Sequence, residues 1–300
     1  MIESLREILS VPVDAVPLAL FRCLLGIIIV VNLLKNWNSI LKYYTRSSYY
    51  LFFEWTPFVR PLKKMGMQIL MWSIMILSCC FVLGFIYPYC AIFLCLCSFY
   101  VLFIDKAAFS HENYLICLLL LLFSFVDGAR GLSLDSFLFQ SSFFEQTVPY
   151  GHILIIKLQC LIAFSFSGIN KITYEFLIKA VPLRQFLKGF IWSHSKHYKN
   201  FSKFVNRRGA ECTERFFNLK YTPIFLAWTV MLVETFSLSF MFFESTYYLG
   251  LISYLLYHLF KYQFFSRLGF YLNLSALILF LKPSVINQLT HVLINFYDNF

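Results

Sequence analysis

Eight blocks of apolar residues, separated by basic and aromatic connections, constrain the fold of this chain more than any other feature. About 20 apolar residues in a helix can cross a bilayer, because all backbone N–H and C=O groups are then hydrogen-bonded within the segment. Only 13% of the residues are charged, whereas a soluble domain carries about 25%. We therefore predict an all-α protein, a polytopic transmembrane helical bundle of about eight spans. The expected spans are residues 17–34, 68–86, 90–104, 114–126, 152–172, 224–243, 247–260 and 269–281.

The segments around these blocks are expected to belong to one domain over residues 1–300. We predict a short interfacial helix in residues 1–16, an exterior loop in 127–151, a basic polar loop in 173–222 and an amphipathic tail in 283–300. The third and fourth blocks are shorter than the ~20 residues that cross a bilayer untilted, so they either extend through polar residues that face protein or lie inside the bundle. Residues 1–16 contain acids and lack a continuous apolar core, which argues against a cleavable signal peptide.

The net charge of +10 is carried mostly by the connections between the spans. Most lysines and arginines fall in residues 35–66 and 173–222, which an eight-span chain places on the same side of the membrane. The positive-inside rule assigns that side to the cytoplasm and the N-terminus to the outside. Phosphate headgroups account for the basic charge, so a nucleic-acid partner is not expected.

The sequence lacks the signatures of soluble enzymes and of metal sites. It has no phosphate-binding glycine loop, no HExxH motif and no GxSxG motif. The nine cysteines lie mostly within or beside apolar blocks, where they act as small hydrophobes, and their spacing fits neither zinc nor a redox pair. His194 and His197 have no cysteine or acidic partner at metal-binding spacing. We expect no metal cofactor and no disulfide framework.

Lys171 ends the fifth block, in the sequence Ala163-Phe-Ser-Phe-Ser-Gly-Ile-Asn-Lys171. Ala163, Ser167 and Lys171 are spaced at i, i+4 and i+8, so one helix face carries small residues that lead to the amine. A second helix can approach such a face closely and leave the amine in a partly desolvated crevice. Burial favours the neutral form of an amine, which is a base. The alternative is a lysine that snorkels to the headgroups and has no chemistry.

Four other polar residues interrupt the apolar blocks: Arg22, Gln159, Glu234 and His258. Arginine keeps its proton, so Arg22 needs a partner or a water-filled cavity unless it snorkels. A hydrogen bond between helices is the ordinary explanation for any one of the other three. Several such residues in one chain indicate a polar cavity.

The turn before the fourth block concentrates polar residues between two short spans. Ser110 is a predicted N-cap, and His111 and Glu112 follow it, where a dry site would let them transfer protons. The alternative is an ordinary capped turn, with Asp105 and Lys106 in water.

Short motifs around these residues follow one another in a recognisable order. They are Ala19-Leu-Phe-Arg22 with Gly26, Arg60-Pro-Leu62, Asp105-Lys106 with His111-Glu-Asn-Tyr-Leu115, Phe125-Val-Asp127, Leu132-Ser-Leu-Asp135, Gln159 with Ser167-Gly-Ile-Asn-Lys171, and His258 with Gln263-Phe-Phe-Ser266. In this order the chain resembles the HTTM (horizontally transferred transmembrane) family, to which vitamin K-dependent γ-glutamyl carboxylase belongs. The serial order carries the resemblance more than any single motif.

This resemblance implies a membrane enzyme similar to a vitamin K-dependent γ-carboxylase. By position, Lys171 would be the base that deprotonates a quinol-type cosubstrate, a reduced quinone of the vitamin K hydroquinone or menaquinol type. His111 and Glu112 occupy the positions of the family's asparagine–histidine pair and would act with Lys171 as catalytic residues. The residues that would line the cofactor cavity are Arg22, Asn113, Gln159 and His258.

The resemblance also sets the expected partners and location. The carboxylase binds its peptide substrate with a soluble domain, so we expect a peptide or protein substrate, or a partner subunit, in addition to the lipid bilayer. A bacterial cytoplasmic membrane is the expected location, with menaquinol in place of vitamin K. A second hypothesis makes the chain a maturation or export partner for a secreted toxic peptide, acting with another subunit that docks on loop 173–222. A third is a structural membrane subunit without chemistry.

Overall fold

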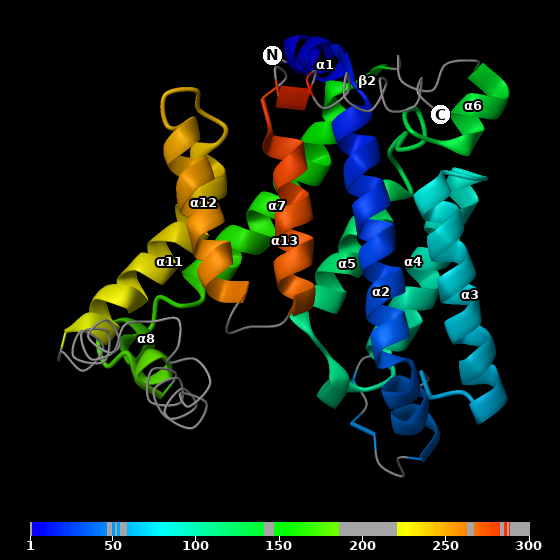
Figure 1. Cartoon of the computed structure of the whole chain (residues 1–300), viewed down its shortest axis with the longest axis horizontal. Helices are drawn as coiled ribbons and strands as arrows, with labels where there is room; N and C mark the ends of the chain where they lie inside the picture. Colours follow the sequence, from blue (N-terminus) through cyan, green and yellow to red (C-terminus); the bar gives the residue numbers. More distant parts are fainter. Residues whose placement is uncertain are drawn as a thin grey trace, which may run out of the picture. The chain divides into compact units, whose positions relative to one another are not determined.

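The computed structural model describes residues 2–46, 50–51, 53–54, 59–140, 147–185, 221–262, 267–282, 285–286 and 288. Most of its secondary structure is helical (Figure 1). The helices are α1 (Ile2–Ser10), α2 (Val16–Arg46), α3 (Lys64–Leu83), α4 (Tyr87–Phe103), α5 (His111–Phe123), α6 (Leu134–Gln140), α7 (Tyr150–Ile169), α8 (Tyr174–Leu177), α11 (Thr222–Phe240), α12 (Tyr247–Tyr262) and α13 (Arg267–Phe280). Two short strands, β1 (Pro12–Asp14) and β2 (Thr147–Pro149), and one 3-10 turn, η1 (Lys106–Ala108), accompany them.

Each predicted apolar block coincides with a helix, so the predicted all-α fold is confirmed. Among the described residues, four helices are long and apolar enough to cross a membrane, namely Val16–Tyr44 within α2, together with α3, α7 and α11. The apolar helices α4, α5 and α13 are shorter, and α12 has 16 residues. The chain is therefore an integral membrane protein with several spans, while the number eight stays a prediction.

The chain divides into two compact units by its internal contacts. Unit 1 comprises Met1–Cys160 and Lys261–Phe300, and unit 2 comprises Leu161–Phe260. Helix α7 contributes its first part to unit 1 and its last part to unit 2. The single domain expected over residues 1–300 stays a prediction.

Helix α2 is central to unit 1, because it packs on both α3 and α13 (Figure 1). Its buried residues Leu18, Phe21 and Leu25 recur every three or four positions, which is the spacing of one helix face. The ring of Phe123 in α5 lies 5.9 Å from that of Phe21 and 5.6 Å from that of Phe81 in α3. Aromatic rings from three helices therefore share one core.

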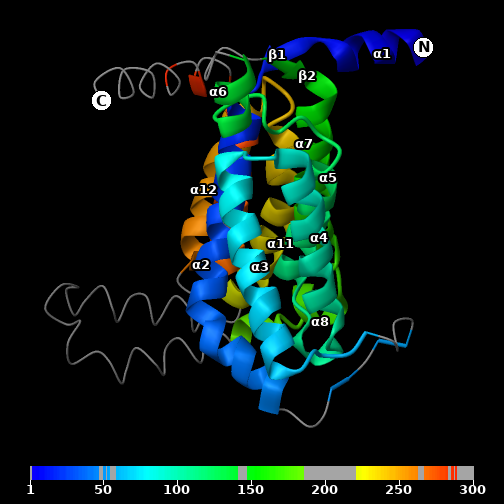
Figure 2. The same ribbon diagram turned by 90° about the vertical axis from the view of Figure 1, so that its right-hand side faces the viewer.

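The N-terminal segment of unit 1 contains structure that the sequence predicts only in part. A helix is expected within residues 1–16, and α1 confirms it, whereas its interfacial position stays a prediction. Figure 2 shows α1 lying across the direction of α2 to α5. Strand β1 then pairs antiparallel with β2, with Val13 opposite the buried Val148, so this short sheet ties the start of α2 to the start of α7.

Helix α6 holds the turn between α3 and α4, although the sequence predicts only a loop in the region of α6. Gly84 ends α3 with a φ of 64°, a left-handed conformation that glycine adopts without strain. Both carboxylate oxygens of Asp135 in α6 accept backbone N–H groups at the start of α4, from Ile86 and Tyr87, each at 2.9 Å. The expectation of an exterior loop over residues 127–151 is therefore corrected, because α6 docks there as a cap for α4.

Unit 2 is built from the end of α7 and from α8, α11 and α12. Leu177 and Ala180 form a buried cluster with Ala227 and Met231 of α11. A Cβ on Gly250 of α12 would lie 2.6 Å from the carbonyl oxygen of residue 237, so the backbones of α12 and α11 approach closely. Most of the basic loop predicted over 173–222 and most of the predicted tail lie outside the described residues.

We expect Gly84→Ala to destabilise the protein strongly. The new methyl would sit in a left-handed backbone and 2.5 Å from the Arg22 Nη1 atom. We expect the free energy of unfolding to fall by about 2 kcal/mol or more, measured by thermal unfolding in detergent. Gly131→Ala is the matched control, since its Cβ would lie 3.4 Å from the Ala15 Cβ, an ordinary contact. Equal melting temperatures for the two variants would contradict this role of Gly84.

Candidate functional site

Lys171 lies just beyond the C-terminal end of α7, in the turn that leads to α8. Its backbone N–H donates to the carbonyl oxygen of Gly168 at 3.0 Å, so the turn continues from the last residues of the helix. The Lys171 side chain is 25% exposed. The amine is therefore neither fully buried nor extended into open solvent.

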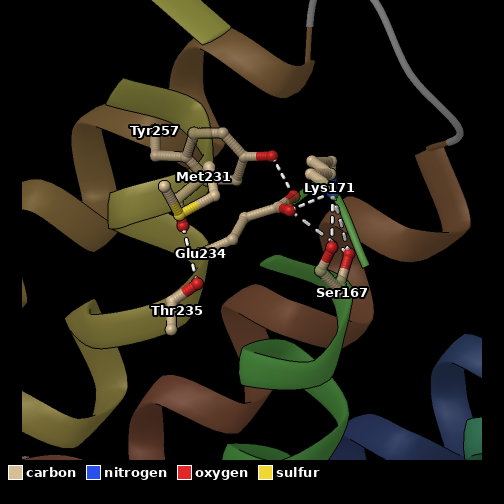
Figure 3. Close-up of polar contacts among 6 residues, drawn as sticks. All are labelled: Ser167, Lys171, Met231, Glu234, Thr235 and Tyr257. Atoms are coloured by element: carbon tan, nitrogen blue, oxygen red, sulfur yellow. Dashed lines mark hydrogen bonds and ion pairs between the residues drawn. The ribbon is translucent and has the colours of Figure 1, made fainter. Parts of the chain in front are cut away.

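Glu234, at the middle of α11, is the acidic partner of Lys171 (Figure 3). Its side chain is only 1% exposed, and its Oε2 atom forms an ion pair with the Lys171 Nζ atom. Oε2 also accepts a hydrogen bond from the Ser167 hydroxyl at 3.2 Å, and Oε1 accepts one from the Tyr257 hydroxyl of α12. Three donors from three segments therefore surround one buried carboxylate.

The Lys171 ammonium is fully supplied with acceptors. Besides Glu234, its Nζ atom donates to the carbonyl oxygen of Ser167 at 2.9 Å and to the Ser167 hydroxyl at 3.1 Å. An ammonium has three hydrogens, and three acceptors receive them. Ser167 thus links the two charged groups, accepting from the lysine and donating to the glutamate.

A close crossing of α7 and α11 positions this cluster, which we call the Lys171–Glu234 cluster (Ser167, Lys171, Glu234 and Tyr257). A Cβ on Gly168 would lie 2.7 Å from the backbone nitrogen of Thr235, so only glycine fits between the helices. The Ser165 hydroxyl donates to the carbonyl oxygen of Thr235 at 2.9 Å. The sequence predicts a close approach along Ala163, Ser167 and Lys171, and in unit 2 the contact runs through Gly168 and Ser165.

His258 lies next to this cluster in the sequence, directly after Tyr257, and is 1% exposed. Its ring centroid is 4.3 Å from that of Tyr254, 5.3 Å from that of Phe164 and 5.3 Å from that of Tyr257. The imidazole is thus enclosed by aromatic rings of unit 2. The predicted cofactor contact of His258 stays a prediction.

Arg22 is fully buried in unit 1, where backbone carbonyl groups bind its guanidinium. Nη1 donates to the carbonyl oxygen of Gly128 at 2.9 Å, and Nη2 donates to those of Val82 and Leu132 at 3.2 and 2.6 Å. The Tyr87 ring lies beneath it, with its centroid 5.9 Å from Cζ. Within the described residues Arg22 forms no ion pair, so its charge is balanced by carbonyl dipoles of α3 and of the segment between α5 and α6.

The other predicted site residues also belong to unit 1. The hydroxyl of Ser110 accepts from the backbone N–H of Asn113 at 3.1 Å, so the predicted N-cap of α5 is confirmed. His111 is exposed at the start of this helix, and Glu112 and Asn113 are half-buried. Gln159 is half-buried in the first part of α7. The catalytic and cofactor-binding roles predicted for these residues stay predictions.

Asp105 corrects one expectation from the sequence. The capped-turn alternative places the Asp105 carboxylate in water, but Asp105 is only 1% exposed. It accepts the backbone N–H groups of Ala107 at 2.9 Å and Leu51 at 3.1 Å, together with the Tyr43 hydroxyl. Burial raises the pKa of the nearby Tyr50 phenol, and the charge of Asp105 adds to this shift. Lys106 is exposed, as expected.

Sequence reasoning singles out Lys171 and Glu234 separately but misses their pairing and the part played by Tyr257. A buried carboxylate in an apolar helix requires a cation or several donors, and this rule would have directed attention from Glu234 to a lysine on a neighbouring span. Tyr257 carries no such signal, since it is one of 19 tyrosines. Groups of three or more metal-ligating side chains do not occur within the described part of the chain.

We expect the charges of Lys171 and Glu234 to stabilise the fold only as a pair. Lys171→Met leaves a buried carboxylate without its cation, and we expect this variant to lose about 3 kcal/mol of unfolding free energy. Glu234→Gln leaves an amine that water partly reaches, so the expected loss is smaller, about 2 kcal/mol. The double variant removes both charges and should lose less than the sum of the two single losses. Unfolding measured in detergent provides this double-mutant cycle, and additive losses would contradict the coupling.

Comparison with known protein families agrees with this picture. A family model described as HTTM domain matches residues 11–284, which include all of unit 2, most of unit 1 and every residue of the Lys171–Glu234 cluster. No solved structure matches the chain. Since the family match covers most of the sequence, the chain belongs to the HTTM-domain family.

Proposed function

We propose that this HTTM-family protein is a membrane-embedded enzyme that removes a proton from a quinol-type cosubstrate, with Lys171 as the base. One observation carries the proposal: hydrogen bonds link Tyr257, Glu234, Ser167 and Lys171. Of the charged pair, the glutamate is 1% exposed and the lysine 25%. A molecule that approaches from outside the cluster therefore meets the amine and not the carboxylate.

The ion pair supplies a route to the neutral amine that a base requires. In water the charged pair is favoured, because solvent stabilises both ions. When an apolar molecule covers the amine and excludes water, separated charges become costly, and a proton can pass from Lys171 Nζ to Glu234 Oε2. The neutral amine can then accept a hydroxyl proton from the bound molecule. Glu234 stores the first proton, while Ser167 and Tyr257 keep its carboxylate in place.

The quinol-type cosubstrate follows from the family resemblance and suits the chemistry of this cluster. Such a molecule supplies a weakly acidic hydroxyl on an apolar ring. Lys171 offers an amine at the edge of an apolar unit, and phenol–amine proton transfer is ordinary general base chemistry. By the same resemblance we propose a γ-carboxylase-like reaction on a peptide or other substrate, in a bacterial cytoplasmic membrane. Menaquinol is the proposed form of the cosubstrate.

The alternative, a maturation or export partner for a secreted peptide, rests on the basic loop 173–222. Residues 186–220 of this loop lie outside the described residues, so no observed contact favours it. It stays a prediction, and it differs from the enzyme proposal in requiring no proton transfer at Lys171.

Lys171→Arg tests the proposal, because arginine keeps the positive charge but does not become neutral. In proteoliposomes supplied with reduced menaquinone and oxygen, we expect the wild-type protein to consume the quinol faster than empty liposomes. Lys171→Arg should lower this rate by about a hundredfold or more, as loss of a general base does. The measurement is the decrease of quinol absorbance at equal protein content.

Lys157→Arg is the matched control for this experiment. Lys157 is a half-buried lysine within α7, with its Nζ atom 5.7 Å from the Phe280 ring centroid and outside the Lys171–Glu234 cluster. We expect its variant to retain the wild-type rate. A Lys171→Arg variant as active as Lys157→Arg, or a wild-type rate no higher than that of empty liposomes, would refute the proposed function.

A further inference from the structure

Unit 1 contains an apolar groove between α2 and α13, with a volume of about 880 Å³. Its walls carry aliphatic side chains, among them Ile27 and Val31 of α2 and Leu274 of α13, which are 45%, 40% and 37% exposed. The volume lies within the range of about 300–1,000 Å³ that is usual for small-molecule sites. The groove is therefore large enough for a small molecule, and its lining is mostly hydrocarbon.

The position of the groove along α2 corresponds to one half of a bilayer. With a rise of 1.5 Å per residue, Leu24 lies ~12 Å and Asn36 ~30 Å along the helix from Val16. These two residues mark the ends of the groove on α2. Because the hydrocarbon core is ~30 Å thick, a helix that enters it at Val16 has the groove running from near the midplane to the far boundary. This is the depth of a single lipid leaflet.

Polar side chains are confined to one end of the α2 wall. Asn32, Lys35 and Asn36 line the groove there, and Asn36 Nδ2 donates both of its hydrogens to Asn32, at 2.9 and 3.0 Å. The Lys35 side chain is exposed, and within the described ranges it forms no ion pair. Its ammonium is thus available to a ligand at the mouth of the groove.

A pair of tryptophans lies near this end of the groove. Trp37 follows Lys35 on α2, and its ring lies 5.2 Å from that of Trp72 in α3. Tryptophan is enriched at the boundary between hydrocarbon and headgroups. Lys35 therefore lies at the polar end of the hydrocarbon-lined groove, from which its long side chain can extend to a lipid phosphate.

We infer that this groove is a binding site for one anionic glycerophospholipid, with an acyl chain along α2 and α13 and the phosphate on Lys35. A single ligand that contacts both Lys35 and the apolar wall must carry an anionic group and a hydrocarbon chain. A free phosphate would contact only Lys35, and an uncharged hydrocarbon would contact only the wall. The site lies wholly within unit 1 and does not depend on the proposed function of Lys171.

Lipid binding to the purified full chain tests this inference. The chain in detergent is titrated with phosphatidylglycerol or phosphatidylcholine of identical acyl chains, and the bound lipid is counted by native mass spectrometry. We expect the first phosphatidylglycerol to bind about fivefold more tightly, as one lysine at the membrane surface provides. Lys35→Gln should abolish this preference. Val31→Trp should fill the groove and weaken the binding of both lipids.

Matched substitutions on the same helix control for charge and for bulk. Lys42→Gln and Leu34→Trp alter exposed residues of α2 that do not line the groove, and both should bind lipid as the wild type does. Thermal unfolding identifies any misfolded variant. If Val31→Trp is misfolded, Ile27→Trp replaces it. Equal affinity of the wild type for the two lipids would overturn the inference. Identical effects of Lys35→Gln and Lys42→Gln would do so as well.

Discussion

The structure of unit 2 depends on the neutralisation of one carboxylate that is removed from water. A glutamate in the middle of an apolar helix costs several kcal/mol unless a cation and hydrogen-bond donors meet it. Glu234 receives all of these, from Lys171, Ser167 and Tyr257. The need to bring them together accounts for the glycine at the crossing of α7 and α11 and for the end of α7 two residues before the lysine. The local geometry at the end of α7 and the long-range pairing of Lys171 with Glu234 therefore depend on each other.

The same constraint is met differently in unit 1. Arg22 is buried without an acid among the described residues, and three carbonyl groups bind its guanidinium. Asp105 is buried with no cationic partner in the described part of the chain, and two backbone N–H groups and one phenol bind it. Main-chain groups of the connecting segments supply most of these partners, so each charge ties a connection between helices to the bundle. These buried charges fix the positions of the helix ends. Apolar packing alone would allow the helices to shift along one another.

Hydropathy predicts the positions of the helices well, but it does not predict which polar residues pair between them. Every apolar block became a helix, and Ser110 caps α5, because both depend on nearby residues alone. Asp105, by contrast, looks like a solvated turn residue and is buried, since its burial depends on Leu51, more than fifty positions away. The pairing of Lys171 with Glu234 crosses a similar gap. Two charges in separate spans suggest a pair, but the choice of partner depends on a helix crossing that only Gly168 permits.

Comparison of the three buried charges explains why we place the proposed chemistry in unit 2. Arginine does not release its proton at Arg22. Asp105 is bound by two backbone N–H groups and the Tyr43 hydroxyl, and no amine is among its partners in the described residues. Of these three sites, only the Lys171–Glu234 pair joins an amine to a carboxylate, directly and through Ser167. The lysine of this pair stays 25% exposed while its partner is buried. An amine base that acts on a bound molecule requires a neighbouring acceptor for its own proton and an open side, and Lys171 has both, in Glu234 and in its 25% exposure.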